Sequence, residues 1–137
     1  MLTHALDLEH LSIAAYTAGI PLLPALAQKA GKEFLLQEFA HASAVATLVK
    51  QAGGKPGAPP PSYDLGNPRR PADVLALLHR IERTTIAAYL DAITRLPPGT
   101  VRTRLATILT NEAQHLAVVR LLLGLAPVPA ALADGTE

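Results

Sequence analysis

Apolar residues recur along the chain at intervals of three, four and seven, which is the spacing of one face of an α-helix. The pattern runs through four segments, roughly residues 2–20, 24–52, 72–96 and 100–124. Each segment is long enough for a helix of about 30 Å at 1.5 Å per residue. The pattern therefore predicts an all-α fold of four helices.

Proline and glycine separate these segments at three places, residues 20–24, 53–71 and 96–100. Proline disfavours the interior of a helix and restricts the residue before it, so we expect the helices to end there. Asp73 follows Pro71 closely and could cap the third helix. We expect one domain over residues 1–126, with the crossover 53–71 inside it, and a flexible tail over 127–137.

The first half of the chain resembles the second. LEHLSIAAYTAGI (8–20) aligns with IERTTIAAYLDAI (81–93), and EFAH (38–41) aligns with EAQH (112–115). The two offsets are 73 and 74 residues. Duplication of a helical hairpin is the simplest account of this repeat.

The spacing of four glutamates tests this hairpin arrangement. Residues of two antiparallel helices lie at one height when they are equally distant from the turn. The midpoint between Glu9 and Glu38 falls within residues 20–24, and the midpoint between Glu82 and Glu112 falls at Pro97. The link over 53–71 is long for a turn, and at roughly 3.3 Å per extended residue it could cross the whole bundle. We therefore expect an antiparallel four-helix bundle of two duplicated hairpins joined by a long crossover.

Composition, net charge and the lack of cysteine exclude several classes of function. Half of the residues are apolar and 17% are charged, which favours one well-buried core. The net charge of +1 gives no support to nucleic-acid binding. The absence of cysteine excludes thiolate zinc sites and cysteine-ligated iron–sulfur clusters. No apolar run is long enough to span a membrane and no targeting segment is visible, so a cytoplasmic location is the default expectation.

A charged residue in the middle of an apolar stripe is costly unless it is paired or bound to metal. Each predicted helix carries one glutamate there: Glu9, Glu38, Glu82 and Glu112. The second and fourth helices each add a histidine three residues later, His41 and His115, on the same helix face. Four carboxylates and two imidazoles should therefore converge at one level of the core.

Four uncompensated carboxylates would repel each other, and some would have to take up protons. Two divalent cations would cancel the four negative charges. Oxygen-rich sites with one imidazole for each metal suit iron or manganese. The pattern of two lone glutamates and two Glu-x-x-His motifs is the one known from dinuclear carboxylate bundles.

On these motifs the chain resembles the ferritin-like di-iron carboxylate superfamily, to which bacterioferritin and rubrerythrin belong, over about residues 2–124. The resemblance implies two iron or manganese ions that react with dioxygen or peroxide. It also implies a division of the ligands. Glu38 and Glu112 would bridge the two ions, Glu9 and His41 would serve one ion, and Glu82 and His115 would serve the other.

The expected activity is oxidation of Fe(II), or reduction of peroxide or dioxygen, at the dinuclear centre. Two alternatives remain: a non-catalytic stress protein that sequesters metal, and a structural bundle with a relic site. Met1 is the only methionine, so we expect no haem ligated by methionine. Few carboxylates remain beyond the four glutamates, which disfavours iron storage.

Two tyrosines and one histidine lie close to the expected site. Tyr16 and Tyr89 each follow a lone glutamate by seven residues, on the same stripe. They are either redox-active or supporting residues of the site, or core aromatics whose hydroxyls reach a polar partner near the end of the bundle. His79 precedes Glu82 by one turn and either contacts it or is partly exposed.

The first helix carries a second apolar stripe, which includes Leu8, Leu11, Ala15, Ala18 and Leu22. An exposed apolar band usually marks an interface, and a two-fold homodimer is the commonest assembly. The stripe therefore predicts a homodimer or a higher homo-oligomer through this helix. The alternative is that the crossover or the tail packs over the stripe.

Overall fold

The structure is a computed structural model, and it describes residues 1–136. This part of the chain contains four α-helices and no strand, which confirms the all-α prediction. The helices are α1 (Leu2–Gly19), α2 (Ala25–Gln51), α3 (Pro71–Arg95) and α4 (Thr100–Leu122), with a short 3₁₀ turn, η1 (Ile20–Leu22), after α1.

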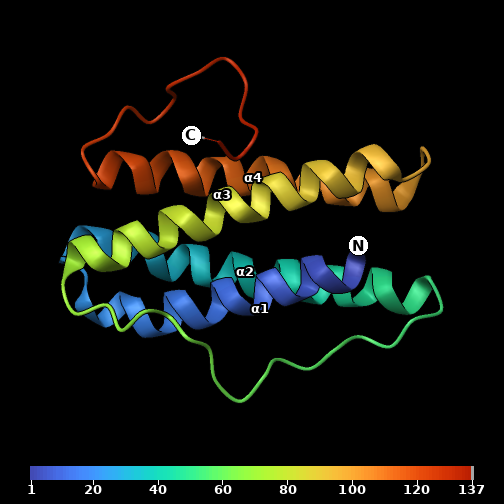
Figure 1. The fold of residues 1–137 in the computed structure, drawn as a ribbon, viewed down its shortest axis with the longest axis horizontal. Helices are drawn as coiled ribbons and strands as arrows, with labels where there is room; N and C mark the ends of the chain where they lie inside the picture. Colours follow the sequence, from blue (N-terminus) through green and yellow to red (C-terminus); the bar gives the residue numbers. More distant parts are fainter. Residues whose placement is uncertain (137) are drawn as a thin grey trace.

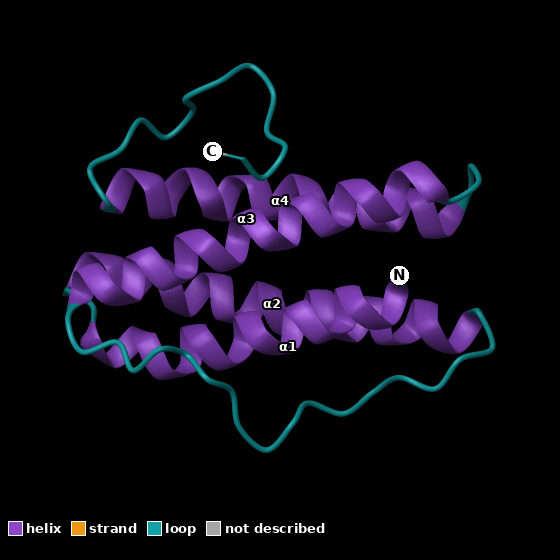
Figure 2. Cartoon of the chain, viewed as in Figure 1, coloured by secondary structure: helices purple, strands orange, loops and turns teal. Residues whose placement is uncertain are grey.

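The four helices form a bundle of two antiparallel hairpins (Figure 1). Helices α1 and α2 make the first hairpin, α3 and α4 make the second, and α1 also packs along α3. The segment between α2 and α3 runs outside the helices from one end of the bundle to the other (Figure 2). The long crossover is therefore observed, and both hairpins turn at the proline-containing segments that the sequence indicates.

The start of α3 shows how local sequence fixes a boundary. Pro71 occupies the first turn, where a missing backbone N–H costs nothing. The backbone N–H groups of Arg70 and Arg69 donate to the Asp73 carboxylate, at 3.0 and 3.3 Å. Asp73 therefore caps the helix from inside its first turn.

Two apolar clusters fill the two ends of the bundle core. One includes Ala15, Leu78 and Val119, and the other includes Leu6 and Leu105. Along each helix, the buried glutamate lies between the residues that enter these two clusters. The core is therefore a polar layer between two apolar layers.

Much of the apolar stripe on α1 is covered within the single chain. Leu8 and Ala15 are buried, and Leu11 packs into the same cluster as Leu65 of the crossover. The large apolar side chains that remain exposed include Leu26 and Leu36 on α2. The homodimer through α1 stays a prediction, which light scattering of the purified chain would test.

Two further features concern the chain's surface and its C-terminal segment. No helix within residues 1–136 is both long and apolar enough to cross a membrane.

After α4 the chain folds back along the second hairpin (Figure 1). Arg120 Nε donates to Ala126 O at 2.7 Å, and Arg83 Nε donates to Gly135 O at 3.1 Å. Flexibility of this tail stays a prediction.

Candidate metal centre

Each helix contributes one fully buried glutamate to the polar layer. The carboxylates of Glu9, Glu38, Glu82 and Glu112 are 0% exposed. Residues three positions apart on a helix project from one face, so His41 accompanies Glu38 on α2 and His115 accompanies Glu112 on α4. The structure therefore brings together all six residues that the sequence singles out.

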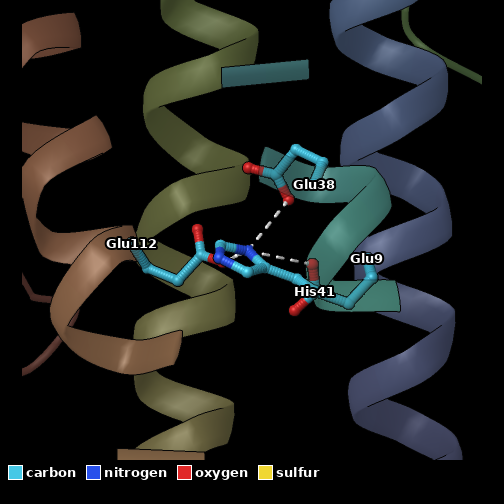
Figure 3. A group of neighbouring side chains, drawn as sticks. All are labelled: Glu9, Glu38, His41 and Glu112. Carbon is cyan, nitrogen blue, oxygen red and sulfur yellow. Dashed lines mark ion pairs between the residues drawn. The ribbon is translucent and has the colours of Figure 1, made fainter. Parts of the chain in front are cut away.

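His41 lies between carboxylates from three helices (Figure 3). Its Nδ1 atom is 2.7 Å from Glu112 Oε1, 3.6 Å from Glu9 Oε2 and 3.9 Å from Glu38 Oε2. The closest carboxylate thus belongs to the Glu-x-x-His motif of the other hairpin. This crossing links α2 to α4 through the cluster.

His115 has the mirrored surroundings. Its Nδ1 atom is 3.0 Å from Glu38 Oε1, 3.5 Å from Glu112 Oε2 and 3.7 Å from Glu82 Oε1. The two imidazole rings are nearly parallel, with centroids 6.0 Å apart. Both histidines therefore turn the same ring nitrogen toward the carboxylates.

The donor atoms fall into two overlapping groups. One group is Glu9, Glu38, His41 and Glu112, and the other is Glu38, Glu82, Glu112 and His115. Within each group the chosen donor atoms lie within 4.8 Å of one another. Donors about 2.1 Å from one ion can lie up to about 4.2 Å apart, so small side-chain shifts would close each group on an ion. Glu38 and Glu112 occur in both groups.

Hydrogen bonding within the chain leaves this cluster unsatisfied. Among the described residues, both carboxylate oxygens of Glu38 and of Glu112, and one each of Glu9 and Glu82, lack a hydrogen bond of ordinary geometry, although imidazole nitrogens of His41 and His115 lie close to several of them. Buried polar atoms are normally paired, and buried charges normally coordinate metal or meet a counter-charge. The residues present therefore fit metal ions in atom type and position.

Burial and mutual repulsion raise the pKa values of the two lone glutamates. Burial raises the pKa of Glu9 to about 8, and repulsion from Glu112 and Glu38 acts in the same direction. Burial, together with repulsion from Glu112 and Glu38, also raises the pKa of Glu82 well above its usual value. Without metal, Glu9 therefore holds a proton at neutral pH, and Glu82 is shifted in the same direction.

The neighbouring carboxylates raise the pKa values of the two imidazoles, which favours their charged form. Burial alone would lower the pKa of His41, but hydrogen bonds with Glu112, Glu38 and Glu9 raise it to about 12. The pKa of His115 is raised as well, because hydrogen bonds with Glu112 and Glu38 outweigh its burial. Burial would raise the pKa of Glu112, but hydrogen bonds from His115 and His41 lower it to about 2. Without metal, the His41 imidazolium therefore pairs with the Glu112 carboxylate.

The two tyrosines contact the carboxylates across the hairpins. Tyr16 donates its hydroxyl to Glu82 Oε1, and Tyr89 donates its hydroxyl to Glu9 Oε1. Both rings are fully buried. Their hydroxyls thus reach the centre of the bundle and not a polar group at its end. Each tyrosine orients the lone glutamate of the other hairpin.

Replacing either tyrosine with phenylalanine should destabilise the metal-free chain. The substitution keeps the ring but leaves a buried carboxyl without its donor, at a cost of about 1–3 kcal/mol. Tyr63 on the crossover is the matched control, because its hydroxyl has no partner among the described residues. Urea denaturation of Tyr16→Phe, Tyr89→Phe and Tyr63→Phe measures the effect. Equal stabilities in all three variants would contradict the role assigned to the two hydroxyls.

The structure adds residues that the sequence did not single out. His115 Nε2 donates to Gln37 Oε1 at 2.6 Å, and the Phe34 ring stacks on His115. Ser12 and Thr85, which the repeat aligns, are fully buried one turn after Glu9 and Glu82. The i, i+3 spacing of Ser12 and Thr85 from the glutamates was a signal that sequence reasoning could have used.

His79 lies outside both donor groups. It is half-buried, and its Nε2 atom is 3.2 Å from Arg120 Nη1. Its ring therefore contributes to the junction of α3 and α4 near the tail.

Comparisons with known proteins agree with the fold. The model of a family described as a ferritin-like domain matches residues 1–125. Among solved structures, the chain is similar to a conserved hypothetical protein, rv2844, from Mycobacterium tuberculosis, with a TM-score of 0.84. That match covers 89% of this chain and 93% of the other at 22% identity, so it shows a shared fold. No curated protein matches the chain.

Proposed function

The chain belongs to the ferritin-like domain family, and we propose that its buried cluster binds two iron or manganese ions. The proposed activity at these ions is oxidation of Fe(II), or reduction of peroxide or dioxygen. One observation carries the proposal: two buried donor groups that share Glu38 and Glu112. Packing alone does not favour four buried carboxylates and two imidazoles whose donor atoms lie within 4.8 Å of one another in each group.

The proposal assigns the donors by group. Glu9 and His41 would hold one ion, Glu82 and His115 would hold the other, and Glu38 and Glu112 would serve both. When bound, two such ions supply the two electrons that reduction of peroxide requires. The oxygen-rich donor set with one imidazole for each ion favours iron or manganese over softer metals.

The chain's own residues prepare this chemistry in three ways. The apolar layers on either side of the cluster keep bulk water away, which strengthens every electrostatic interaction inside. Tyr16 and Tyr89 hold the carboxyl groups of Glu82 and Glu9 in place. Binding of cations would release the protons that the metal-free cluster holds, so affinity should rise with pH.

Anaerobic titration with Fe(II), followed by exposure to air, tests the proposal. We expect about two ions to bind per chain and to be oxidised when air is admitted. The Glu38→Ala/Glu112→Ala double variant is the blank, because it removes both shared carboxylates. Elemental analysis of chain purified without chelators identifies the metal it carries.

The same titration separates the alternatives. Tight binding without oxidation would replace the enzyme by a protein that sequesters metal. No binding would leave a structural bundle with a relic site and would overturn the proposal. Addition of peroxide in place of air distinguishes the two oxidants.

A further inference from the structure

The repeat places equivalent residues around the two histidines, but the side chains differ. His115 corresponds to His41, so Gln37 of α2 corresponds to Asn111 of α4. By the same offset, Phe34 corresponds to Ile108. The repeat therefore pairs the longer amide at His115 with a shorter amide in the other half, and the aromatic ring at His115 with an aliphatic side chain.

His115 is held on both sides. Its Nδ1 atom faces the carboxylates, 3.0 Å from Glu38 Oε1, and its Nε2–H donates to Gln37 Oε1 at 2.6 Å. The Phe34 ring stacks on the imidazole, with centroids 4.2 Å apart and planes at 27°. The imidazole is fully buried. Its rotation and position are therefore fixed.

His41 lacks this support. The Asn111 side chain is one methylene shorter than that of Gln37, and its Nδ2 atom lies 3.5 Å from Gln114 Oε1 on its own helix. Within residues 1–136, no side chain takes the place of Gln37 at His41 Nε2. His41 also retains 8% exposure to solvent. The two halves of the centre are therefore inequivalent.

We propose that Gln37 is a positioning residue for His115, and that it makes the Glu82–His115 half of the centre hold its metal ion more tightly than the Glu9–His41 half. This inference rests on the proposed function. An acceptor on the outer N–H of a ligating imidazole fixes the ring and makes its inner nitrogen a better donor. Loss of such a partner typically weakens metal binding about 10- to 100-fold.

Anaerobic titration with Co(II), a spectroscopic probe that air does not oxidise readily, measures the two binding steps. We expect Gln37→Met to weaken the tighter step about 10- to 100-fold and to leave the other step unchanged. Methionine keeps the length of the side chain but is a very weak acceptor. Asn111→Leu is the matched control from the other hairpin and should change neither step.

A conservative variant separates hydrogen bonding from packing. Gln37→Glu keeps an acceptor at the same length, so we expect it to retain the tight step. In the Co(II)-loaded chain, the Nε2–H proton of His115 should give a shifted, slowly exchanging NMR signal. That signal should be lost in Gln37→Met and kept in Asn111→Leu, which a general loss of stability would not produce. Gln37 is exposed, so circular dichroism should show unchanged helicity in every variant.

Each other outcome has a defined meaning. The role of Gln37 is overturned if Gln37→Met leaves both steps unchanged, weakens both equally or keeps the slow proton, or if Gln37→Glu loses the tight step. In those cases the wild-type chain still binds two ions and the proposed function stands. A wild-type chain that binds no Co(II) and no Fe(II) overturns the proposed function, and the inequivalence of the halves with it.

Discussion

The Glu38→Ala variant should bind fewer than one metal ion per chain, whereas the Glu9→Ala variant should retain about one. Glu38 belongs to both donor groups, so its loss removes a ligand from each ion. Glu9 belongs to one group only, so its loss leaves the Glu82–His115 half complete. The measurement is metal content per chain after dialysis at moderate metal concentration.

The second hairpin offers an internal repeat of this experiment. Glu112→Ala should behave as Glu38→Ala does, and Glu82→Ala should retain about one ion. Glu33, an exposed glutamate on the same helix as Glu38, gives the control variant Glu33→Ala, which should keep two ions. Oxidation of Fe(II) in air should follow the same order, because a two-electron step needs both ions.

The helical fold should survive each of these substitutions. The two apolar clusters that fill the ends of the core are untouched by these substitutions, so the helices keep most of their packing. Circular dichroism recorded alongside the metal analysis checks this point. Equal metal loss from Glu9→Ala and Glu38→Ala would contradict the shared role of Glu38. Full metal content in all four alanine variants would place the site elsewhere.

The sequence predicted the bundle because two strong signals agree in this chain. Helical periodicity places the apolar residues, and a glutamate inside an apolar stripe is too costly to be incidental. The equal distances of Glu9 and Glu38 from the first turn then bring these carboxylates to one height. The same reasoning applies to Glu82 and Glu112, and the structure places all four together.

The rest depended on contacts that a periodic pattern does not encode. The partner of Tyr16 is Glu82 because α1 packs against α3, and hydroxyl reach across two helices cannot be read from spacing on one helix. Gln37 is exposed, where pattern carries little information, and its role depends on the reach of one side chain. The packing of Leu65 of the crossover against the same apolar cluster as Leu11 was likewise open, because a 19-residue link has many routes.

The metal-free chain should lose stability as pH rises from 5 to 7. The pKa of Glu9 is about 8 in the folded chain and 4.5 when unperturbed, so between these values the folded chain keeps a proton that the unfolded chain releases. Glu82 shifts in the same direction. Stability associated with a raised pKa is complete below the unfolded value and falls as pH increases, by about 1.4 kcal/mol per pH unit for each retained proton.

The remaining groups define the limits of this window. His41 has a folded pKa of about 12 against 6.5, so the stability it provides falls only above pH 6.5. His115 shifts in the same direction. Glu112 has a pKa lowered to about 2, so its contribution is lost as pH falls below 4.5. The metal-free chain should therefore be most stable near pH 4.5–5, and the decline toward pH 7 should come mainly from Glu9 and Glu82.

Urea denaturation of the metal-free chain at pH 5 and pH 7, with and without Mn(II), measures this dependence. Mn(II) should restore stability at pH 7, since cations replace the retained protons and bind only the folded chain. The Glu9→Gln/Glu82→Gln double variant, whose side chains stay neutral, should flatten the dependence between pH 5 and pH 7, while Glu33→Gln should not. In a shared, buried layer, desolvation and mutual repulsion must favour the protonated forms of the carboxyl groups. A metal-free chain that is no more stable at pH 5 than at pH 7 would therefore contradict the convergence of these groups in one layer.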